Sequence, residues 1–244
     1  MRNIKLVLEY DGNDYAGWQR QKNSLAVQQV LEKAIFNITR EQVNTIGCSR
    51  TDSGVHAKEF VCNFYTESNI EDKKFRNAIN AKLPEDIRIL SSIEMETNFH
   101  SRYCCKGKTY SYTIFNREIN SAIYRNYSCH VRKSLNIDKM VLASQYFIGK
   151  HDFSAFRTLG SSAKTTERTI KSLDVLEVDP YIKIYGTADG FLYNMMRIIC
   201  GTLIDVGLER KKPEDIIKIL ESRDRKKAGK ASPAQGLCLE KVYY

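Results

Sequence analysis

The chain has 244 residues, enough for one large domain or two ordinary domains that need no disulfides for stability. The 38 Lys and Arg against 29 Asp and Glu leave a net charge of +9, which favours a polyanionic partner, and 14 Tyr and 10 Phe favour RNA over a membrane. No run of 18 apolar residues is present, and Lys5 interrupts the short apolar stretch near Met1, so neither a membrane span nor a signal peptide is expected.

The first half of the chain predicts the element order β-α-β-β-α-β. Alternating apolar residues predict a strand over 4–10, which ends in the turn-forming residues 11–14. A spacing of three and four predicts a helix over 27–38, with Ser24 as its cap. Strands over 46–48 and 60–64, a helix over 75–83 that stops before Pro84, and a strand over 87–95 follow. This order is typical of a ferredoxin-like unit, in which helices cover one face of an antiparallel sheet.

The pattern restarts after residue 105, where we place a domain boundary between 1–105 and 106–244. The second half predicts a strand over 110–114, a helix over 137–148 closed by Gly149, and strands over 170–178 and 181–187. A helix over 192–206 ended by Gly207, a short helix from Pro213 and a terminal strand over 237–244 complete it. The fold class is therefore α+β, with two ferredoxin-like halves.

The seven cysteines are odd in number and form no CxxC pair, so they are expected to be reduced cytosolic thiols. Cys104 and Cys105 with His100, or Cys129 with His130, match the spacing of no zinc site. No metal is expected.

The segment Ser49–His56, SRTDSGVH, places Asp52 in a turn just after a short strand. An aspartate in a turn often does no more than accept hydrogen bonds from the backbone. Arg50 is a nearby cation that favours the ionised carboxylate, and an ionised carboxylate can act as a nucleophile or a base. Both interpretations remain open from spacing alone.

The same eight residues closely resemble the catalytic motif of the tRNA pseudouridine synthase A family, in which the aspartate is essential. Further motifs agree in order and spacing over essentially the whole chain: EYDG (9–12), YAGWQRQ (15–21), NAKLPEDI (80–87), FHSR (99–102), KTYSY (108–112), GKHDF (149–153), FLYNMMR (191–197) with Gly201, and QGL (235–237).

This resemblance implies a pseudouridine synthase fold built of two RNP-like halves. Residues 1–105 would carry the catalytic aspartate loop, and residues 106–244 would complete the active-site cleft. The implied protein is a cytoplasmic homodimer and an isomerase, an intramolecular transferase that converts uridine to pseudouridine at positions 38, 39 and 40 in the anticodon stem-loop of tRNA. No cofactor and no metal are implied.

The resemblance also implies roles for five residues. Asp52 would act on the nucleoside, either by covalent addition or by removing a sugar proton to give a glycal. Tyr110 would stack on the extruded base, although it could instead be part of a packed sheet face. Arg197 interrupts an apolar helix, so a salt bridge to Asp52 is the physical expectation if both line the cleft, with a surface position as the alternative. Arg50 would help to displace the target base or clamp a phosphate, and Leu237 would pack beneath the uracil.

Two other functions compete with this one. A non-catalytic RNA-binding or chaperone protein could share the fold and charge, and an N-glycosidase using one carboxylate would release free uracil. Other side chains could contact RNA. Trp18 is either a stacking residue or a core anchor, and the charged run 223–230 is expected to be a solvated loop rather than an RNA contact. A basic track could be formed by Lys150, Arg157, Lys164 and Arg168.

Overall fold

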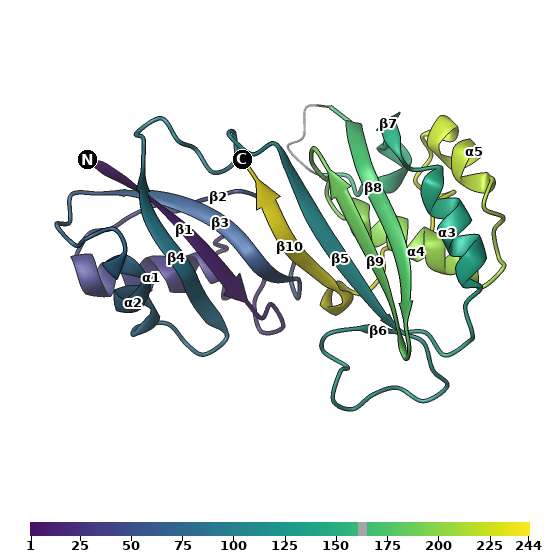
Figure 1. Cartoon of the computed structure of the whole chain (residues 1–244), viewed down its shortest axis with the longest axis horizontal. Coiled ribbons are helices and arrows are strands. Elements are labelled where there is room, and N and C mark those ends of the chain that lie inside the picture. Colours follow the sequence, from purple (N-terminus) through teal and green to yellow (C-terminus); the bar gives the residue numbers. More distant parts are fainter. Residues whose placement is uncertain (161–164) are drawn as a thin grey trace. The chain divides into compact units, whose positions relative to one another are not determined.

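The computed structural model describes residues 1–160 and 165–244, so Lys164 lies outside the described residues (Figure 1). Its backbone contacts group the chain into two compact units. Unit 1 is Met1–Lys106 together with Cys238–Tyr244, and unit 2 is Gly107–Leu237. Sequence analysis assigned the terminal strand to the second domain, whereas its residues from Cys238 onward group with the first unit.

Unit 1 is a ferredoxin-like β-α-β-β-α-β unit with one added strand. Its elements are β1 (Arg2–Tyr10), α1 (Val27–Thr39), β2 (Ile46–Gly47), β3 (His56–Thr66), α2 (Lys74–Asn80), β4 (Ile87–Met95) and β10 (Leu237–Tyr243). β1 lies between β4 and β3 and is antiparallel to both, and β2 pairs antiparallel with β3. The expected element order is therefore confirmed.

The core of unit 1 follows from the apolar spacing in the sequence. Alternate residues of β1 are buried, and in β3 all of residues 60–64 are buried. The apolar positions of α1 that recur every three or four residues are also buried. Phe64 of β3 meets Phe75 of α2 edge to face, with ring centroids 5.6 Å apart. The helices α1 and α2 also contact each other.

The predicted cap of α1 is wrong. The helix begins at Val27 after an extended Ala26, and Ser24 does not cap it. Instead, the N–H of Val27 donates to the carbonyl oxygen of Gly17 at 3.1 Å, and the N–H of Gln28 donates to that of Trp18 at 3.0 Å. A distant backbone segment thus satisfies donors that a side-chain cap would otherwise take.

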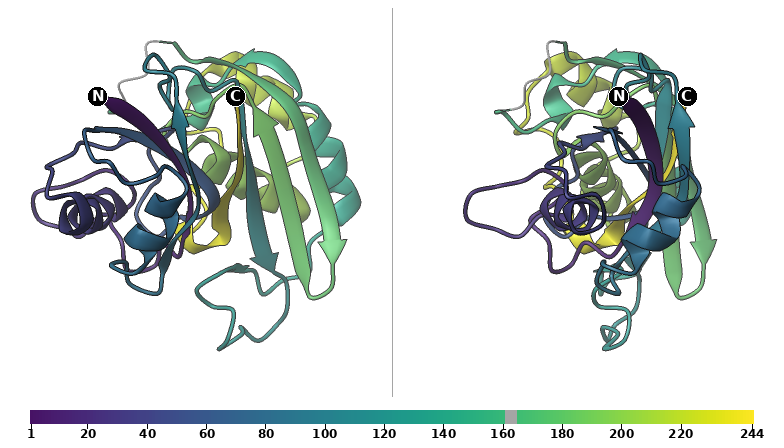
Figure 2. Two further views of the ribbon diagram at one scale, coloured as in Figure 1. Left: turned by 60° about the vertical axis from the view of Figure 1, so that its left-hand side comes forward. Right: turned by 90° about the vertical axis from the view of Figure 1, so that its left-hand side faces the viewer.

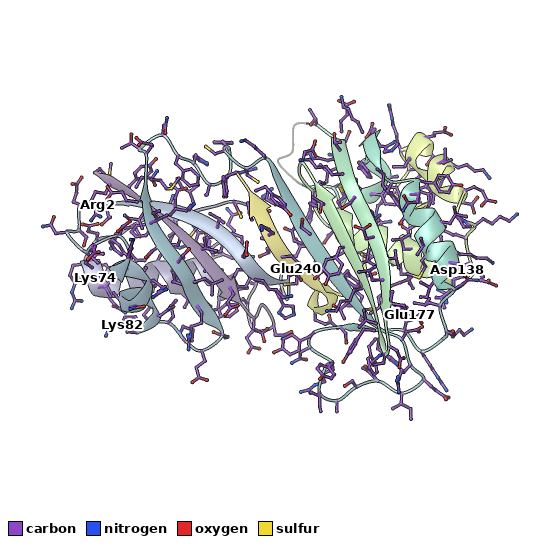
Figure 3. The ribbon with its side chains drawn as sticks, viewed as in Figure 1. Arg2, Lys74, Lys82, Asp138, Glu177 and Glu240 are labelled. Atoms are coloured by element: carbon purple, nitrogen blue, oxygen red, sulfur yellow. The ribbon has the colours of Figure 1, made fainter. Side chains whose placement is uncertain are left out.

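The added strand β10 runs parallel to β3, with Cys238 opposite His56 and Leu239 opposite Ala57. Lys58 Nζ of β3 lies 3.0 Å from Glu240 Oε1 of β10, and Figure 3 labels Glu240 on this strand. This pairing places Cys238 and Leu239 beside the last residue of the Ser49–His56 motif and the residue that follows it.

Unit 2 contains β5 (Gly107–Phe115), β6 (Cys129–His130), α3 (Ile137–Gln145), β7 (Gly149–Asp152), β8 (Glu167–Val178), β9 (Tyr181–Ala188), α4 (Met195–Gly207) and α5 (Asp215–Ser222). Two short 3-10 helices, Ser154–Phe156 and Ala234–Gly236, complete it. The strands β5, β9, β8 and β7 pair antiparallel in that order, and β6 pairs parallel with β5.

The helices of unit 2 lie on one side of its sheet (Figure 2). α3 packs against α4 and β8, and α4 also contacts β5. Burial alternates strictly along β9, and most of α4 is buried. An antiparallel sheet covered by helices is the α+β architecture expected from the sequence. The prediction for α3 was too long, because the helix ends at Gln145 and Gly149, with φ +105°, begins β7.

Within the described ranges, no helix is both long and apolar enough to cross a bilayer. No group of three or more His, Cys, Asp or Glu side chains in these ranges is arranged to hold a metal ion. All seven cysteines are free thiols, and Cys62 is fully buried within β3.

Candidate active site

Asp52 is the first residue of a tight turn in unit 1. The Val55 N–H donates to the Asp52 carbonyl oxygen at 3.2 Å, and Gly54 has φ +78°, the value of the third position in a type II turn. Asp52 is half-buried and Arg50 is exposed. The turn predicted from the sequence is confirmed, and it presents the carboxylate on a loop between β2 and β3.

The segment Tyr10–Trp18 forms a cradle for this turn. The Tyr15 carbonyl oxygen accepts hydrogen bonds from Gly54 N and Ser53 Oγ, each at 3.2 Å. On the other side, the Trp18 N–H donates to the Thr51 carbonyl oxygen at 3.3 Å, and the Tyr10 and Thr51 hydroxyls are 2.9 Å apart. Both residues that flank Asp52 are therefore fixed by the cradle.

Two glycines allow the cradle to approach the turn closely. A Cβ on Gly12 would lie 2.0 Å from the carbonyl oxygen of Val55. A Cβ on Gly17 would lie 2.2 Å from the carbonyl oxygen of Thr51, and Gly17 also has φ +87°. Any side chain at either position would push on the backbone of the turn that carries Asp52, at Val55 or at Thr51.

The cradle is tied to the rest of unit 1 by buried polar contacts. Tyr15 Oη donates to Asp86 Oδ1 at 2.8 Å, and burial, followed by this hydrogen bond, raises the pKa of Tyr15 well above its usual value. The Gly12 N–H donates to His56 Nδ1 at 3.1 Å, and Asp11 Oδ1 lies 3.1 Å from the same nitrogen. Tyr15 and Asp86 belong to two separate motifs of the sequence, and nothing in their spacing reveals that they touch.

Trp18 is a core anchor. It is buried and stacks on Phe60 of β3 with ring centroids 4.1 Å apart. A Cβ on Gly47 would lie 2.4 Å from Trp18 Nε1, so the indole fills the space beside β2. This packing shows that Trp18 is the core anchor, and not the RNA-stacking residue, of the two interpretations that the sequence allows.

In unit 2, Tyr110 lies on β5 opposite Gly186 of β9. Its ring is buried and meets Phe191 edge to face at 5.1 Å. Tyr112, two residues after Tyr110 on β5, is fully buried, and burial raises the pKa of its phenol far above the usual value. Tyr112 is therefore a neutral core residue.

Tyr112 also positions the QGL motif. Its Oη donates to the Pro233 carbonyl oxygen at 2.9 Å, and a Cβ on Gly236 would lie 2.8 Å from Tyr112 Cζ. The short helix Ala234–Gly236 therefore sits directly against the ring, and Leu237 follows it. Leu237 is buried.

Arg197 lies in the first turn of α4 and is half-buried. Its Nε donates to the Ser232 carbonyl oxygen at 2.8 Å, while the Ser232 N–H donates to the Arg197 carbonyl oxygen at 3.0 Å. The elements that carry Tyr110, Arg197 and Leu237 thus pack against one another within unit 2. The expected ion pair of Arg197 with Asp52 would join the two units and stays a prediction.

Two cations of the charged run 223–230 make contacts within unit 2. Arg223 Nε lies 3.0 Å from Asp152 Oδ2, and Arg225 Nη1 donates to the Gly229 carbonyl oxygen at 2.8 Å. Burial lowers the pKa of Arg225. Arg223 therefore ties the loop to β7, and Arg225 stabilises the loop itself.

Comparison with known proteins decides the family. A profile described as tRNA pseudouridine synthase matches residues 6–104 and 143–244. The chain belongs to the tRNA pseudouridine synthase family. Family membership makes it an isomerase that acts on uridine in tRNA. Asp52, Arg50, Arg197 and Leu237 lie within the matched ranges, and Tyr110 lies between them.

Full-length relatives agree with this assignment. The synthase is 54% identical over 244 residues to "tRNA pseudouridine synthase A 2" of Clostridium perfringens, with 100% of both chains covered. It is 54% identical to "tRNA pseudouridine synthase A" of Clostridium kluyveri and 50% identical to that of Acetivibrio thermocellus, again with 100% of both chains covered.

Among solved structures, the synthase resembles a chain of the archaeal box H/ACA sRNP Nop10-Cbf5 complex, with 13% identity and a TM-score of 0.39. This match covers 83% of the synthase and 43% of that chain. A chain of a Cbf5-Nop10-Gar1 complex matches at 12% identity and a TM-score of 0.40, covering 96% of the synthase and 57% of that chain.

The cradle predicts a strong effect of Gly17→Ala on the synthase. We expect turnover to fall by at least tenfold, because the new Cβ must displace the Thr51 carbonyl beside Asp52, and misplacement of about 1 Å can cost about 100-fold. Gly149→Ala is the matched control, since Gly149 has φ +105° but a Cβ there would meet only His151 Nε2 at 3.6 Å. Turnover and urea unfolding of both variants test this, and equal turnover would contradict it.

Proposed function

We propose that the protein converts uridine to pseudouridine at positions 38, 39 and 40 in the anticodon stem-loop of tRNA, with Asp52 as the catalytic residue. The proposal rests on one observation above all. The complete SRTDSGVH motif forms a turn that the preceding segment YDGNDYAGW (10–18) holds in place through four hydrogen bonds to residues 51, 53 and 54.

The reaction breaks the bond between N1 of uracil and C1′ of the ribose and forms a bond between C5 and C1′. N1 gains a proton, and the hydrogen of C5 leaves to water, so substrate and product are isomers. The nucleotide must first leave the stem, which costs a few kcal/mol that stacking and backbone contacts repay. An ionised Asp52 would then act on the sugar, by addition at C1′ or by removal of a ribose proton.

The other assigned residues would bind the extruded nucleotide. We propose that Tyr110 stacks on the uracil from β5, that Leu237 packs beneath the ring, and that Arg197 pairs with the Asp52 carboxylate. The exposed position of Arg50, two residues before Asp52, supports a role in displacing the base or binding a phosphate. The net charge of +9 supports attraction of the RNA backbone.

One experiment tests the reaction and its location. Unmodified tRNA labelled with tritium at C5 of uracil is incubated with the protein, tritium released to water is counted, and pseudouridine is mapped in the product. We expect release with an intact strand and modification at positions 38 to 40. Free uracil with an abasic site would identify an N-glycosidase, and binding without release would identify a non-catalytic RNA-binding protein.

We also propose that the protein is a cytoplasmic homodimer. The loop between β5 and β6 supports a partner surface, because Ile119 and Ile123 are 82% and 77% exposed there, and exposed apolar residues of this kind are common at interfaces. Light scattering should give twice the mass of 28.1 kDa. A mass of one chain at micromolar concentration would contradict the dimer.

A further inference from the structure

Asn194 has the position of a helix cap but does not act as one. It precedes α4, and asparagine is among the residues most favoured at this position because its side chain can accept a hydrogen bond from the first turn. Here the side chain makes no capping hydrogen bond, and the residue adopts φ +61°, in the left-handed region. The side chain of Asn194 is therefore used for something else.

The side chain connects Arg197 to Thr158. Asn194 Oδ1 accepts a hydrogen bond from Arg197 Nη1 at 2.7 Å, and Asn194 Nδ2 donates to Thr158 Oγ1 at 2.9 Å. Thr158 is held in turn, since its N–H donates to the Tyr193 carbonyl oxygen at 3.0 Å. The threonine contact orients the amide so that its oxygen faces the guanidinium.

Arg197 is thus held at two points within unit 2. Nε donates to the Ser232 carbonyl oxygen and Nη1 donates to Asn194 Oδ1. Because a guanidinium is planar, fixing two of its nitrogens fixes the direction in which Nη2 points. Without the asparagine contact, the Nε hydrogen bond to Ser232 alone would hold the guanidinium, and the plane of the guanidinium could turn about that hydrogen bond.

We propose that Asn194, oriented by Thr158, is a positioning residue for the Arg197 guanidinium, and through it for the Asp52 carboxylate. This inference rests on the proposed function, in which Arg197 pairs with Asp52. The left-handed conformation of Asn194 accompanies this use of its side chain, which contacts Arg197 and Thr158 and makes no capping hydrogen bond. Strained backbone conformations of this kind gather at functional sites.

The test compares Asn194→Gly with Asn194→Asp. Glycine adopts a positive φ without strain and removes only the side chain, so the protein should fold. Aspartate keeps an oxygen that can accept from Arg197 Nη1, and the Thr158 hydroxyl can donate to its other oxygen. Arg40→Gly is the matched control, because Arg40 also has a positive φ, +63°, at the end of α1 and lies on the surface.

Single-turnover tritium release and the Kd for tRNA are measured for each variant. We expect Asn194→Gly to slow release by about 10- to 100-fold with an unchanged Kd, as for a misplaced catalytic group. Asn194→Asp and Arg40→Gly should stay within about threefold of the wild type. Thr158→Val should slow release in the wild-type background but not when combined with Asn194→Asp, because a carboxylate needs no orienting partner.

The failures of the two proposals are distinguishable. If the wild type releases tritium and Asn194→Gly is equally fast, the positioning role is wrong while the proposed function stands. If Asn194→Gly weakens tRNA binding but not turnover, Asn194 serves RNA binding and the positioning role is again wrong. If the wild type releases no tritium from any tRNA, the proposed function fails and the inference fails with it.

Discussion

Asp52→Asn is expected to abolish tritium release from C5-labelled tRNA. The substitution keeps the size of the side chain and the backbone of the turn but removes the negative charge that either mechanism requires. A lost general base costs about 10²- to 10⁴-fold, and a lost nucleophile costs more. Binding of tRNA should survive and should weaken steeply as salt rises, because phosphate contacts dominate the attraction.

The control for this prediction removes one carboxylate elsewhere. Asp138→Asn makes the same change of charge at an exposed position of α3, labelled in Figure 3, and should leave turnover near the wild-type value. Near-normal release by Asp52→Asn would remove Asp52 from the chemistry. Equal loss in both variants would mean that net charge, and not the residue, governs the reaction.

The sequence predicted local features of the site better than its long-range contacts. The turn at Asp52 could be predicted because Gly54 and the neighbouring polar residues carry the signal within four positions. The cradle could not be predicted from the sequence, because the contact of Gly17 with Thr51 joins residues 34 positions apart and leaves no periodic pattern. The same segment explains the wrong cap of α1, since the carbonyls of Gly17 and Trp18 took the place of Ser24.

The order of strands shows the same limit. Alternation predicted β1, β8 and β9, because each has one buried face and enough residues to show a period of two. It also predicted β3, although residues 60–64 are buried on both faces, and β4, although Ile93 is 44% exposed and Ser92 is buried beyond an irregularity in the pairing with β1. β6 has two residues and β7 has four, and neither carries the alternating apolar residues that predicted the two-residue β2. The terminal strand was predicted, but its parallel pairing with β3 depends on Cys238 meeting His56, which composition and periodicity do not encode.

Arg197→Met is expected to slow single-turnover release by about 100-fold with little change in the Kd for tRNA. Methionine keeps much of the apolar stem but removes the charge that we propose to pair with Asp52. It also removes the donors to Ser232 and Asn194, so the loss of rate alone does not prove the ion pair. A displaced carboxylate would give the same order of effect.

A double-mutant cycle isolates the ion pair. The lost contacts with Ser232 and Asn194 occur whether Asp52 is charged or not, so they cancel when the free energies of urea unfolding are compared for Asp52→Asn, Arg197→Met and the double variant. A direct pair predicts a coupling of about 1–3 kcal/mol, because either single variant leaves a partner uncompensated. The same cycle with Asp138→Asn should be additive. Coupling within about 0.5 kcal/mol of zero for the Asp52 cycle would show that Arg197 stabilises unit 2 without pairing with the catalytic carboxylate.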